Sequence, residues 1–264
     1  MPRFDPHPQR RPALISGASS GIGTATARAL AALGHPVMLG ARRDDECARI
    51  AEKIRDEGGE AFAARLDVTD TQSVDEFVAR GEEALGPTEI VVSGAGDLRV
   101  GRIHEMDPAV FAAQLDVHLS GAQRLVARVV PHMVRRRRGD VVLIGSDVVA
   151  APRPRSGAYN AAKAGVEAMG HQMRMELEGT GVRSSIVRPG PTQTSMGMDM
   201  SAEDAGPLLE DWMRWGFARH PYFLRASDIA AAVTTCVTSP RGAHVTLMEV
   251  QPEAPLHEQT TKEN

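Results

Sequence analysis

The sequence predicts an α/β fold, a single doubly wound domain around a seven-stranded parallel sheet. Two observations lead to this prediction. Short apolar segments alternate with longer amphipathic segments along the 264 residues. The apolar segments also lack the polar alternation of a strand with one wet face, which indicates a sheet covered on both sides. No linker divides the pattern, so we expect one domain over residues 1–264, with loose tails at 1–10 and 252–264.

The first half of the chain holds four of the seven predicted strands. These strands are expected at residues 13–16, 36–41, 61–66 and 90–93. The amphipathic segments between them predict helices at 24–33, 44–57 and 71–85. Strands and helices therefore alternate one by one, as the crossovers of a parallel sheet require.

The second half continues the alternation. Asp107 and Pro108 predict a helix start, because Asp is favoured at the N-cap and Pro at the first helical position. This helix is expected to reach about residue 137, with a bend at Pro131. Strands at 141–146, 184–187 and 244–250 and helices at 157–178 and 226–237 complete the pattern, which residues 191–225 interrupt.

Composition excludes several classes of function. The net charge of −4 gives no electrostatic reason to expect nucleic acid or an anionic membrane as a partner, and we interpret the arginines at 135–138 as a basic helix end. Cys47 and Cys236 lack metal-ligand spacing, so we expect no metal site and a reducing, cytoplasmic compartment. No apolar run is long enough to cross a membrane.

A glycine-rich turn joins the first predicted strand to the first helix. Gly17 permits a tight turn, Gly21 lets the backbone approach a pyrophosphate, and Gly23 lets the helix pack close to the strand. The free N–H groups at the helix start then face the phosphates. Because a strand precedes the turn and a helix follows it, we favour dinucleotide binding over an ordinary glycine-rich turn.

Five segments together resemble the short-chain dehydrogenases/reductases. They are the turn at 16–23, residues 93–96 where the family usually has Asn-Asn-Ala-Gly, Ser146, the Tyr159-x-x-x-Lys163 pair, and residues 189–194. The resemblance spans 16–194 and implies a Rossmann-type fold and an oxidoreductase that uses a nicotinamide cofactor. The cofactor-binding residues that we expect are Gly17, Ser19, Ser20, Gly21, Ile22, Gly23, Arg42, Arg43, Asp67, Val68, Ala95, Gly96, Tyr159, Lys163, Pro189, Gly190, Thr192 and Thr194.

The end of the second predicted strand indicates which cofactor is used. An acidic residue there would bind the ribose 2′-hydroxyl of NAD(H), but the strand ends at Ala41 and continues with Arg42 and Arg43. Guanidinium groups suit the 2′-phosphate of NADP(H), so we expect NADP(H) rather than NAD(H). The alternative is a solvated arginine pair neutralised by the acidic residues at 44–46. Asp67 and Val68 resemble the family's adenine contacts.

Tyr159 and Lys163 are the candidate catalytic pair. They are four residues apart on a predicted helix and share a face, and an ammonium beside a phenol would lower the phenol pKa. Tyr159 would then act as the general acid in carbonyl reduction and the base in alcohol oxidation. Ser146 can hydrogen-bond the substrate oxygen, and Lys163 can reach the nicotinamide ribose. An ordinary surface pair is the alternative, and the resemblance favours catalysis.

His118 stands where the family's catalytic set usually has an asparagine. The resemblance implies that this position holds a water molecule, largely through its backbone carbonyl, and so links Lys163 to solvent. Histidine keeps that carbonyl but changes the size and titration of the side chain. We expect the backbone role to survive, and a proton relay through the imidazole is the alternative.

Residues 191–225 occupy the place of the family's substrate lid. Their apolar side chains either line a lid over a hydrophobic substrate or fill a core or subunit contact. These side chains are Met196, Met198, Met200, Trp212, Met213, Trp215, Phe217, Tyr222 and Phe223. The loop residues Asp97, Arg99, Asp147 and Arg153 could reach the mouth of the same pocket.

These observations predict an NADP(H)-dependent oxidoreductase that interconverts an apolar alcohol and its ketone. A 3-oxoacyl thioester reductase of fatty acid synthesis and a non-catalytic dinucleotide sensor are the alternatives. We also expect a homotetramer or homodimer, because two long helices carry apolar residues beyond those that one sheet can cover. Those residues are Leu125, Val129, Met133, Val166, Met169 and Met173.

Overall fold

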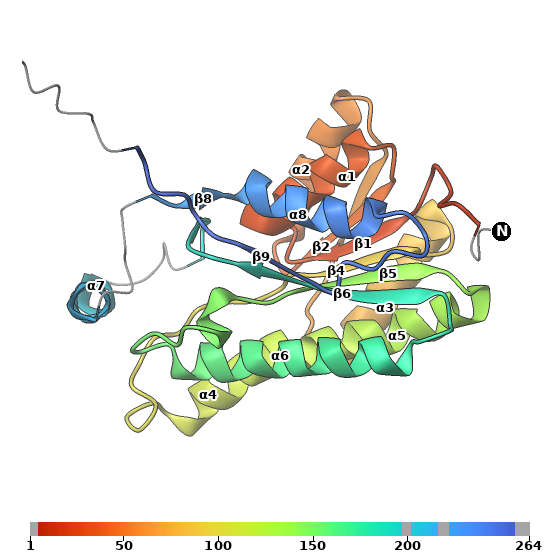
Figure 1. Cartoon of the computed structure of the whole chain (residues 1–264). Helices are drawn as coiled ribbons and strands as arrows, with labels where there is room; N and C mark the ends of the chain where they lie inside the picture. The colour runs from red at the N-terminus through yellow and green to blue at the C-terminus, as the bar shows by residue number, and fades with distance from the viewer. Residues whose placement is uncertain (1–4, 197–201, 216–221, 257–264) are drawn as a thin grey trace, which may run out of the picture.

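A seven-stranded parallel sheet forms the centre of the computed structural model, which describes residues 5–196, 202–215 and 222–256 (Figure 1). The strand order is β3-β2-β1-β4-β5-β6-β9, and all six pairings are parallel. The strands are β1 (Ala13–Ser16), β2 (Val37–Ala41), β3 (Ala61–Arg65), β4 (Ile90–Ser93), β5 (Gly139–Ile144), β6 (Val182–Pro189) and β9 (Leu247–Val250). The order reverses between β1 and β4, and ligands of such folds bind at the carboxyl ends of the strands at that point. The predicted fold class is confirmed.

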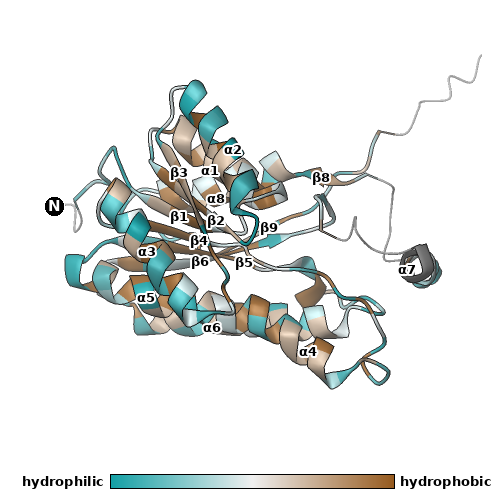
Figure 2. Cartoon of the chain, turned by 180° about the vertical axis from the view of Figure 1, so that it is seen from behind, coloured by the Kyte–Doolittle hydropathy of each residue, from teal (hydrophilic) through white to brown (hydrophobic). Residues whose placement is uncertain are grey.

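Helices cover both faces of the sheet, as Figure 2 shows by the apolar strands enclosed between them. The helices are α1 (Gly21–Ala32), α2 (Asp44–Asp56) and α8 (Ala226–Thr238) on one face, and α3 (Thr71–Leu85), α5 (Gly121–Arg136) and α6 (Gly157–Glu176) on the other. Ile15 packs into the first core and its neighbour Leu14 into the second. Because successive side chains enter opposite cores, the strands show no polar alternation.

The long helix expected from residue 108 is interrupted. It consists of α4 (Pro108–Leu115), a π-helical turn η1 (Asp116–Ser120) and α5. Regular α-helical geometry is lost at η1, whereas Pro131 lies inside α5. A π turn adds one residue to a helical turn and is frequent at functional sites. The inserted turn carries His118, whose side chain is buried.

Residues 191–225 contain elements that the sequence did not predict. Strands β7 (Thr192–Gln193) and β8 (Leu224–Arg225) form a second, two-stranded parallel sheet. Helix α7 (Ala202–Arg214) lies between them in the chain, with Pro207 inside it. Gly206 and Pro207 are poor helix formers, and they hide the helix from propensity-based prediction.

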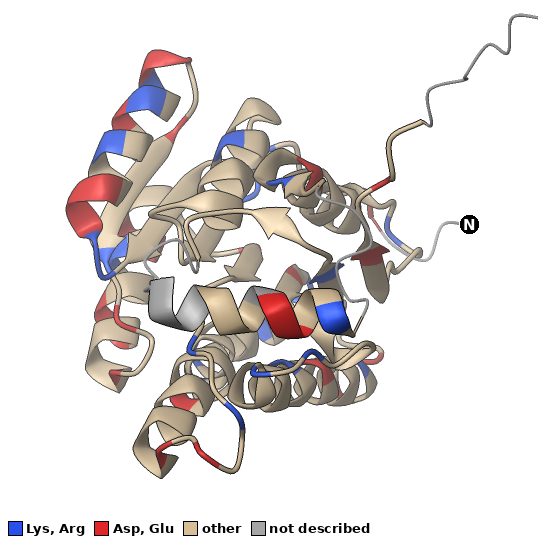
Figure 3. Ribbon diagram, turned by 90° about the vertical axis from the view of Figure 1, so that its left-hand side faces the viewer, with Lys and Arg blue, Asp and Glu red and all other residues tan. Residues whose placement is uncertain are grey.

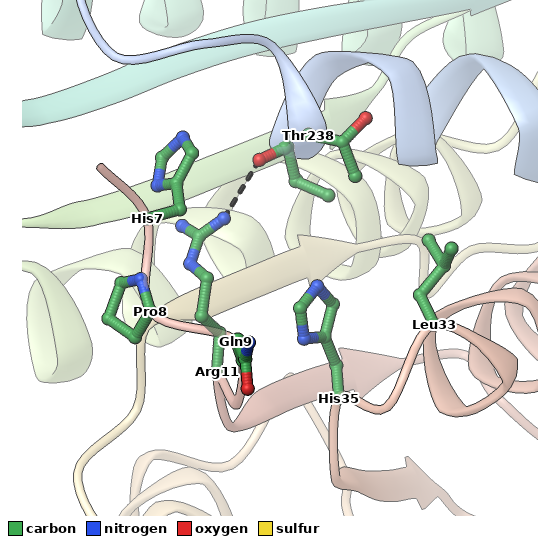
Figure 4. Close-up of a pocket in the computed structure, with 8 residues that line it drawn as sticks. His7, Pro8, Gln9, Arg11, Leu33, His35 and Thr238 are labelled. Atoms are coloured by element: carbon green, nitrogen blue, oxygen red, sulfur yellow. Dashed lines mark hydrogen bonds between the residues drawn. The ribbon is translucent and has the colours of Figure 1, made fainter.

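Residues 7–11, which include the end of the expected N-terminal tail at 1–10, make specific contacts at the amino ends of the strands. Arg10 pairs with Glu60 at 2.8 Å, and Arg11 is 2% exposed. Arg11 donates to the carbonyl of Val237 (Figure 4), and it also pairs with the buried Asp140. This segment borders a cavity of about 240 Å³ lined by His7, Pro8, Gln9, Arg11, Leu33, His35, Val237 and Thr238.

The six apolar residues that were expected to form a subunit contact pack against the sheet instead. Leu125, Val129, Met133, Val166 and Met173 are buried in the second core, and Met169 packs against it. This stripe of both helices therefore faces the strands of the same chain. The expectation of an oligomer therefore needs support from other surfaces.

Candidate active site

The glycine-rich turn after β1 has room for glycine alone. A Cβ at Gly17 would lie 2.6 Å from the Gly94 oxygen, and a Cβ at Gly23 would lie 2.3 Å from the Gly17 oxygen. Gly17 and Gly21 both have positive φ, at 72° and 52°. A Cβ at Gly21 would lie 3.0 Å from Cβ of Thr194, so the loop after β6 closes against this turn. The cradle fits a pyrophosphate held by backbone amides at the start of α1.

Ser16 is a site residue that the sequence analysis did not single out. Its hydroxyl accepts from the amides of Gly94 and Ala95, at 3.1 and 3.3 Å, and donates to the carbonyl of Val92. These bonds join the end of β1 to the loop after β4, which forms one wall of the cradle. In the sequence, Ser16 is a polar residue at the end of an otherwise apolar strand, and this position could have indicated its role.

The arginines after β2 lie beside the glycine-rich turn. Arg43 donates to the hydroxyls of Ser19 and Ser20, at 3.1 and 3.3 Å. Of the acidic residues that could neutralise it, Asp45 and Glu46 both pair with Arg49 instead. Arg43 is thus directed at the phosphate end of the cradle, which favours the 2′-phosphate interpretation over the solvated pair.

Most of the remaining expected cofactor residues follow the ends of β3, β4 and β6. One carboxylate oxygen of Asp67 accepts from the Thr69 amide and hydroxyl, and these bonds hold the pKa of Asp67 below its usual value. Val68 is buried against Gly121, where a Cβ would lie 2.7 Å away. Ile22 packs on the first core, Ala95 and Gly96 follow β4, Pro189 ends β6, and the Thr192 hydroxyl donates to the Gly190 carbonyl.

Ser146, Tyr159 and Lys163 meet at the carboxyl end of β5. Ser146 begins a 3₁₀ turn (Asp147–Val149), and its hydroxyl accepts from the Val148 amide at 3.4 Å. On α6, the Lys163 Nζ lies 5.6 Å from the centre of the Tyr159 ring and donates to the Ile144 carbonyl at 2.7 Å. The sequence expectation of these three residues as one cluster agrees with this arrangement.

The expected lowering of the Tyr159 pKa by Lys163 is wrong for this state of the protein. Burial raises the pKa of Tyr159 to about 12, although a hydrogen bond with Ser146 acts in the opposite direction. Burial also lowers the pKa of Lys163 to about 8. The ammonium is directed at the Ile144 carbonyl, and loss of hydration therefore dominates for both groups.

His118 reaches the same cluster from η1. Its Nε2 lies 2.8 Å from the carbonyl oxygen of Asp97 and 3.2 Å from the Asp97 amide nitrogen, so the imidazole contacts both backbone polar groups of that residue. Its ring meets the Tyr159 ring edge-on, with centres 5.3 Å apart. A Cβ at Gly96 would lie 2.2 Å from the imidazole Cε1. Burial, reinforced by Lys163, lowers the pKa of His118 to about 3, and the imidazole is neutral near pH 7.

Helix α7 is tied to the loop between Ser146 and Tyr159. Arg155 pairs with Asp211 at 2.8 Å, and the Trp212 indole donates to the Pro154 carbonyl. Arg153 pairs with Asp147 and lies over the Trp212 ring. Figure 3, which faces the carboxyl ends of the strands, shows α7 lying across that edge.

The charged residues of this region are engaged with one another or with the catalytic cluster, whereas most of the described apolar residues are exposed to solvent. Asp147 and Arg153 act on the Tyr159 pKa in opposite directions, whereas Asp97 and Arg99 pair with each other. The apolar lid residues Met196, Met213, Trp215, Tyr222 and Phe223 are exposed, and Trp212 is half-buried. The other three candidates, Met198, Met200 and Phe217, lie outside the described residues.

The arginines at 135–138 lie far from this edge. Arg138 pairs with Glu89 at 2.6 Å, and Arg136 donates to the Thr88 carbonyl, just before β4 begins. These contacts lie at the amino end of β4, and they agree with the interpretation of the arginines as a basic helix end. In the described residues no cluster suits a metal ion, and no helix there is long and apolar enough to cross a membrane.

Comparison with known proteins identifies the family. The family model described as short chain dehydrogenase matches residues 11–205. The chain belongs to the short-chain dehydrogenase family. It is therefore an oxidoreductase, and members of this family use nicotinamide dinucleotides.

Individual relatives agree with this assignment. The chain is 32% identical over 239 residues to 2,3-dihydro-2,3-dihydroxybenzoate dehydrogenase of Bacillus subtilis, which covers 89% of this chain and 91% of that one. It is 34% identical to glycine betaine reductase of Emericella nidulans over 90% of its own length, but spans only 18% of that protein. An alcohol dehydrogenase of Thermococcus sibiricus complexed with 5-hydroxy-NADP has a TM-score of 0.77 and 28% identity, covering 94% of this chain and 100% of that one.

In this member of the short-chain dehydrogenase family, His118 contacts the loop after β4. The imidazole fills the space above Gly96 and fixes the Asp97 carbonyl. Ser93 and Gly94 stand where the family usually has two asparagines, and Gly94 is pressed against Gly17. The π turn brings the histidine under this loop.

Proposed function

We propose that this short-chain dehydrogenase is an NADP(H)-dependent enzyme that interconverts an apolar alcohol and its ketone. The observation that carries the proposal is the meeting of Ser146, Tyr159 and Lys163 beside the glycine-rich cradle. Lys163 is anchored to the end of β5, and Tyr159 lies one helical turn away from it. A proton donor and a hydroxyl for orienting a carbonyl therefore face the edge at which the cofactor would bind.

The chain's own residues supply the proton and the orientation. When bound, the nicotinamide supplies the hydride that is added to the carbonyl carbon. The Tyr159 hydroxyl gives its proton to the carbonyl oxygen, and the Ser146 hydroxyl donates a hydrogen bond to the same oxygen. The alcohol is thus formed from one hydride and one proton. The Lys163 ammonium stabilises the phenolate that remains until Tyr159 regains a proton.

Two sets of residues support the finer assignments. Arg43 on Ser19 and Ser20 supplies a guanidinium for a 2′-phosphate, and the Thermococcus sibiricus neighbour carries an NADP derivative. The exposed apolar residues around α7 support an apolar substrate. An apolar substrate would remove these side chains from water, which is favourable. The Bacillus subtilis relative is named for a hydroxylated ring compound, and cyclic ketones are reasonable first substrates.

The test is reduction of a panel of cyclic and long-chain ketones by NADPH, with the parent protein and Tyr159→Phe. Phenylalanine keeps the ring but has no proton to transfer, so we expect turnover to fall roughly 10²–10⁴-fold. NADPH affinity, followed by cofactor fluorescence, should stay close to that of the parent. Near-normal turnover in Tyr159→Phe would contradict the assigned acid. NADPH binding without turnover of any ketone would favour the sensor alternative.

A further inference from the structure

A buried carboxylate lies one helical turn beyond the catalytic lysine. Glu167 follows Lys163 by four residues on α6, on the same face, and is 4% exposed. Its Oε1 would lie 3.1 Å from a Cβ at Gly145. Gly145 follows Ile144, whose carbonyl accepts from the Lys163 ammonium. The carboxylate and the ammonium therefore lie against consecutive residues at the end of β5.

Arg188 holds this carboxylate from the neighbouring strand. Its Nε donates to Oε1 of Glu167 at 2.9 Å, and its Nη2 donates to Oε2 at 2.7 Å. The third contact of the same guanidinium is with Glu249 on β9, at 2.8 Å. A bidentate pair of this kind fixes a carboxylate in position as well as in charge. Charges thus alternate from Glu249 through Arg188 and Glu167 to Lys163.

The other charged groups near Lys163 balance one another or are neutral. His118, from η1, has its pKa lowered to about 3 and is uncharged. Asp147 and Arg153, from the loop after β5, pair with each other. Tyr159 is a neutral phenol with a pKa of about 12. Burial lowers the pKa of Lys163 to about 8, and Glu167 opposes that fall because an anion favours the ammonium.

We propose that Glu167 is a positioning residue whose carboxylate, fixed by Arg188, keeps Lys163 in the ammonium form and in place beside Tyr159. Arg188 has two effects in this arrangement. It anchors the carboxylate, and its own positive charge weakens the effect of that carboxylate on the lysine. The inference rests on the proposed function, because Lys163 is where Glu167 acts on the reaction.

Removing one charge or the other should move the lysine titration in opposite directions. Glu167→Gln removes the anion and leaves Arg188, so Lys163 should lose its proton at a pH about one unit lower. Arg188→Gln leaves Glu167 with the ammonium as its remaining buried counter-charge, so the titration should move to higher pH. A purely structural role would give less stable protein with an unmoved titration, or shifts of the same sign.

The three lysines of the chain allow a direct measurement without cofactor or substrate. With isotope-labelled lysine, the side-chain NMR signals of Lys53, Lys163 and Lys262 can be followed against pH, and Lys163→Arg assigns the buried one. Glu249→Gln is the matched control, since its carboxylate accepts from Arg188 through Nη1, which makes no contact with Glu167, and from Gln251. It should shift the Lys163 titration least. Shifts of the same sign in Glu167→Gln and Arg188→Gln, or no shift in either, would overturn the proposal.

Two further measurements separate the possible failures. The double variant Glu167→Gln, Arg188→Gln removes both buried charges together, and its Lys163 titration should fall between those of the single variants even if one single variant folds poorly. The alkaline limb of kcat/KM for ketone reduction should move to lower pH in Glu167→Gln and to higher pH in Arg188→Gln. Absence of any ketone turnover in the parent would count against the proposed function, while the NMR titration would still decide the role of Glu167.

Discussion

Burial has the largest effect on the protonation of the residues around Tyr159. It raises the pKa of the phenol to about 12, lowers that of Lys163 to about 8 and lowers that of His118 to about 3. Each shift favours the neutral form of the group. Near pH 7 the phenol and the imidazole are therefore neutral, whereas Lys163 is still largely an ammonium. The sequence identified the three residues but not this common direction, because helical spacing shows which side chains meet and not how much water they lose.

The titration of His118 leads to a prediction about its role. Its pKa of about 3 means that the neutral imidazole persists as the pH rises from about 5 to 9. His118→Asn should therefore leave the shape of kcat against pH unchanged over that interval, with any loss being uniform. The measurement is the pH profile of parent and variant under conditions in which chemistry limits turnover. An inflection near neutrality that disappears in the variant would instead make the imidazole a proton relay.

Arg43 and Arg42 offer a matched pair for testing cofactor choice. Both arginines carry the same charge, but the hydrogen bonds with the hydroxyls of Ser19 and Ser20 belong to Arg43. A hydrogen bond to a charged group contributes about 1.5–3 kcal/mol, so Arg43→Gln should weaken NADPH roughly 10–100-fold. NADH affinity should change little, and Arg42→Gln should weaken NADPH less. Equal affinity of the parent for NADPH and NADH, measured by fluorescence titration, would contradict the preference.

Helices and strands differ in how far the sequence predicts them. Strands β1 and β4 match their predicted bounds, whereas β5 lies two residues earlier than predicted, β6 extends two residues further at each end, and β9 begins three residues later. An apolar run indicates a buried strand but does not fix where its pairing begins and ends. The π turn was not predicted, since its residues are compatible with a regular helix and only packing under the loop after β4 shows the extra residue. Helix α7 was missed because Gly206 and Pro207 interrupt its pattern.

The ion pair between α7 and the catalytic loop should affect substrate binding. Asp211→Asn removes the partner of Arg155, so α7 should lie less firmly over the strand ends and KM for the ketone should rise several-fold. Stability should fall by only about 1 kcal/mol or less, because both side chains are partly exposed. Glu210→Gln is the control, as it removes one charge from the exposed side of the same helix. Unchanged KM in Asp211→Asn would show that α7 does not contact the substrate.

At the scale of the whole molecule, one exposed apolar surface away from the strand ends lies on α4. Ala109, Val110, Ala112 and Ala113 are all exposed, and Ile103 just before the helix is 61% exposed. The sequence analysis offered residues of α5 and α6 for a subunit contact, but these residues face the sheet. The spacing of apolar residues along a helix shows that the helix has an apolar face. Which face is covered depends on where the sheet lies.

An oligomer that buries α4 is the expected consequence. We predict a homodimer or homotetramer at micromolar concentration, and Val110→Asp should shift the mass towards the monomer by placing a charge in the contact. Light scattering gives the mass directly. Phe62→Asp, an equally exposed apolar residue on β3, is the control and should leave the mass unchanged. A parent protein that remains monomeric would contradict the prediction.

The close fit of His118 over Gly96 restricts the order in which these two positions can change during evolution or engineering. While the imidazole is present, any side chain at 96 would overlap it, since even a Cβ would lie 2.2 Å from the ring. A replacement at 118 by a smaller residue removes that overlap, so a later change at 96 meets a vacant space. The reverse order passes through an intermediate in which the loop after β4 must move. The two positions therefore form an ordered pair, and a library that varies 96 alone would reject substitutions that a library varying 118 first would accept.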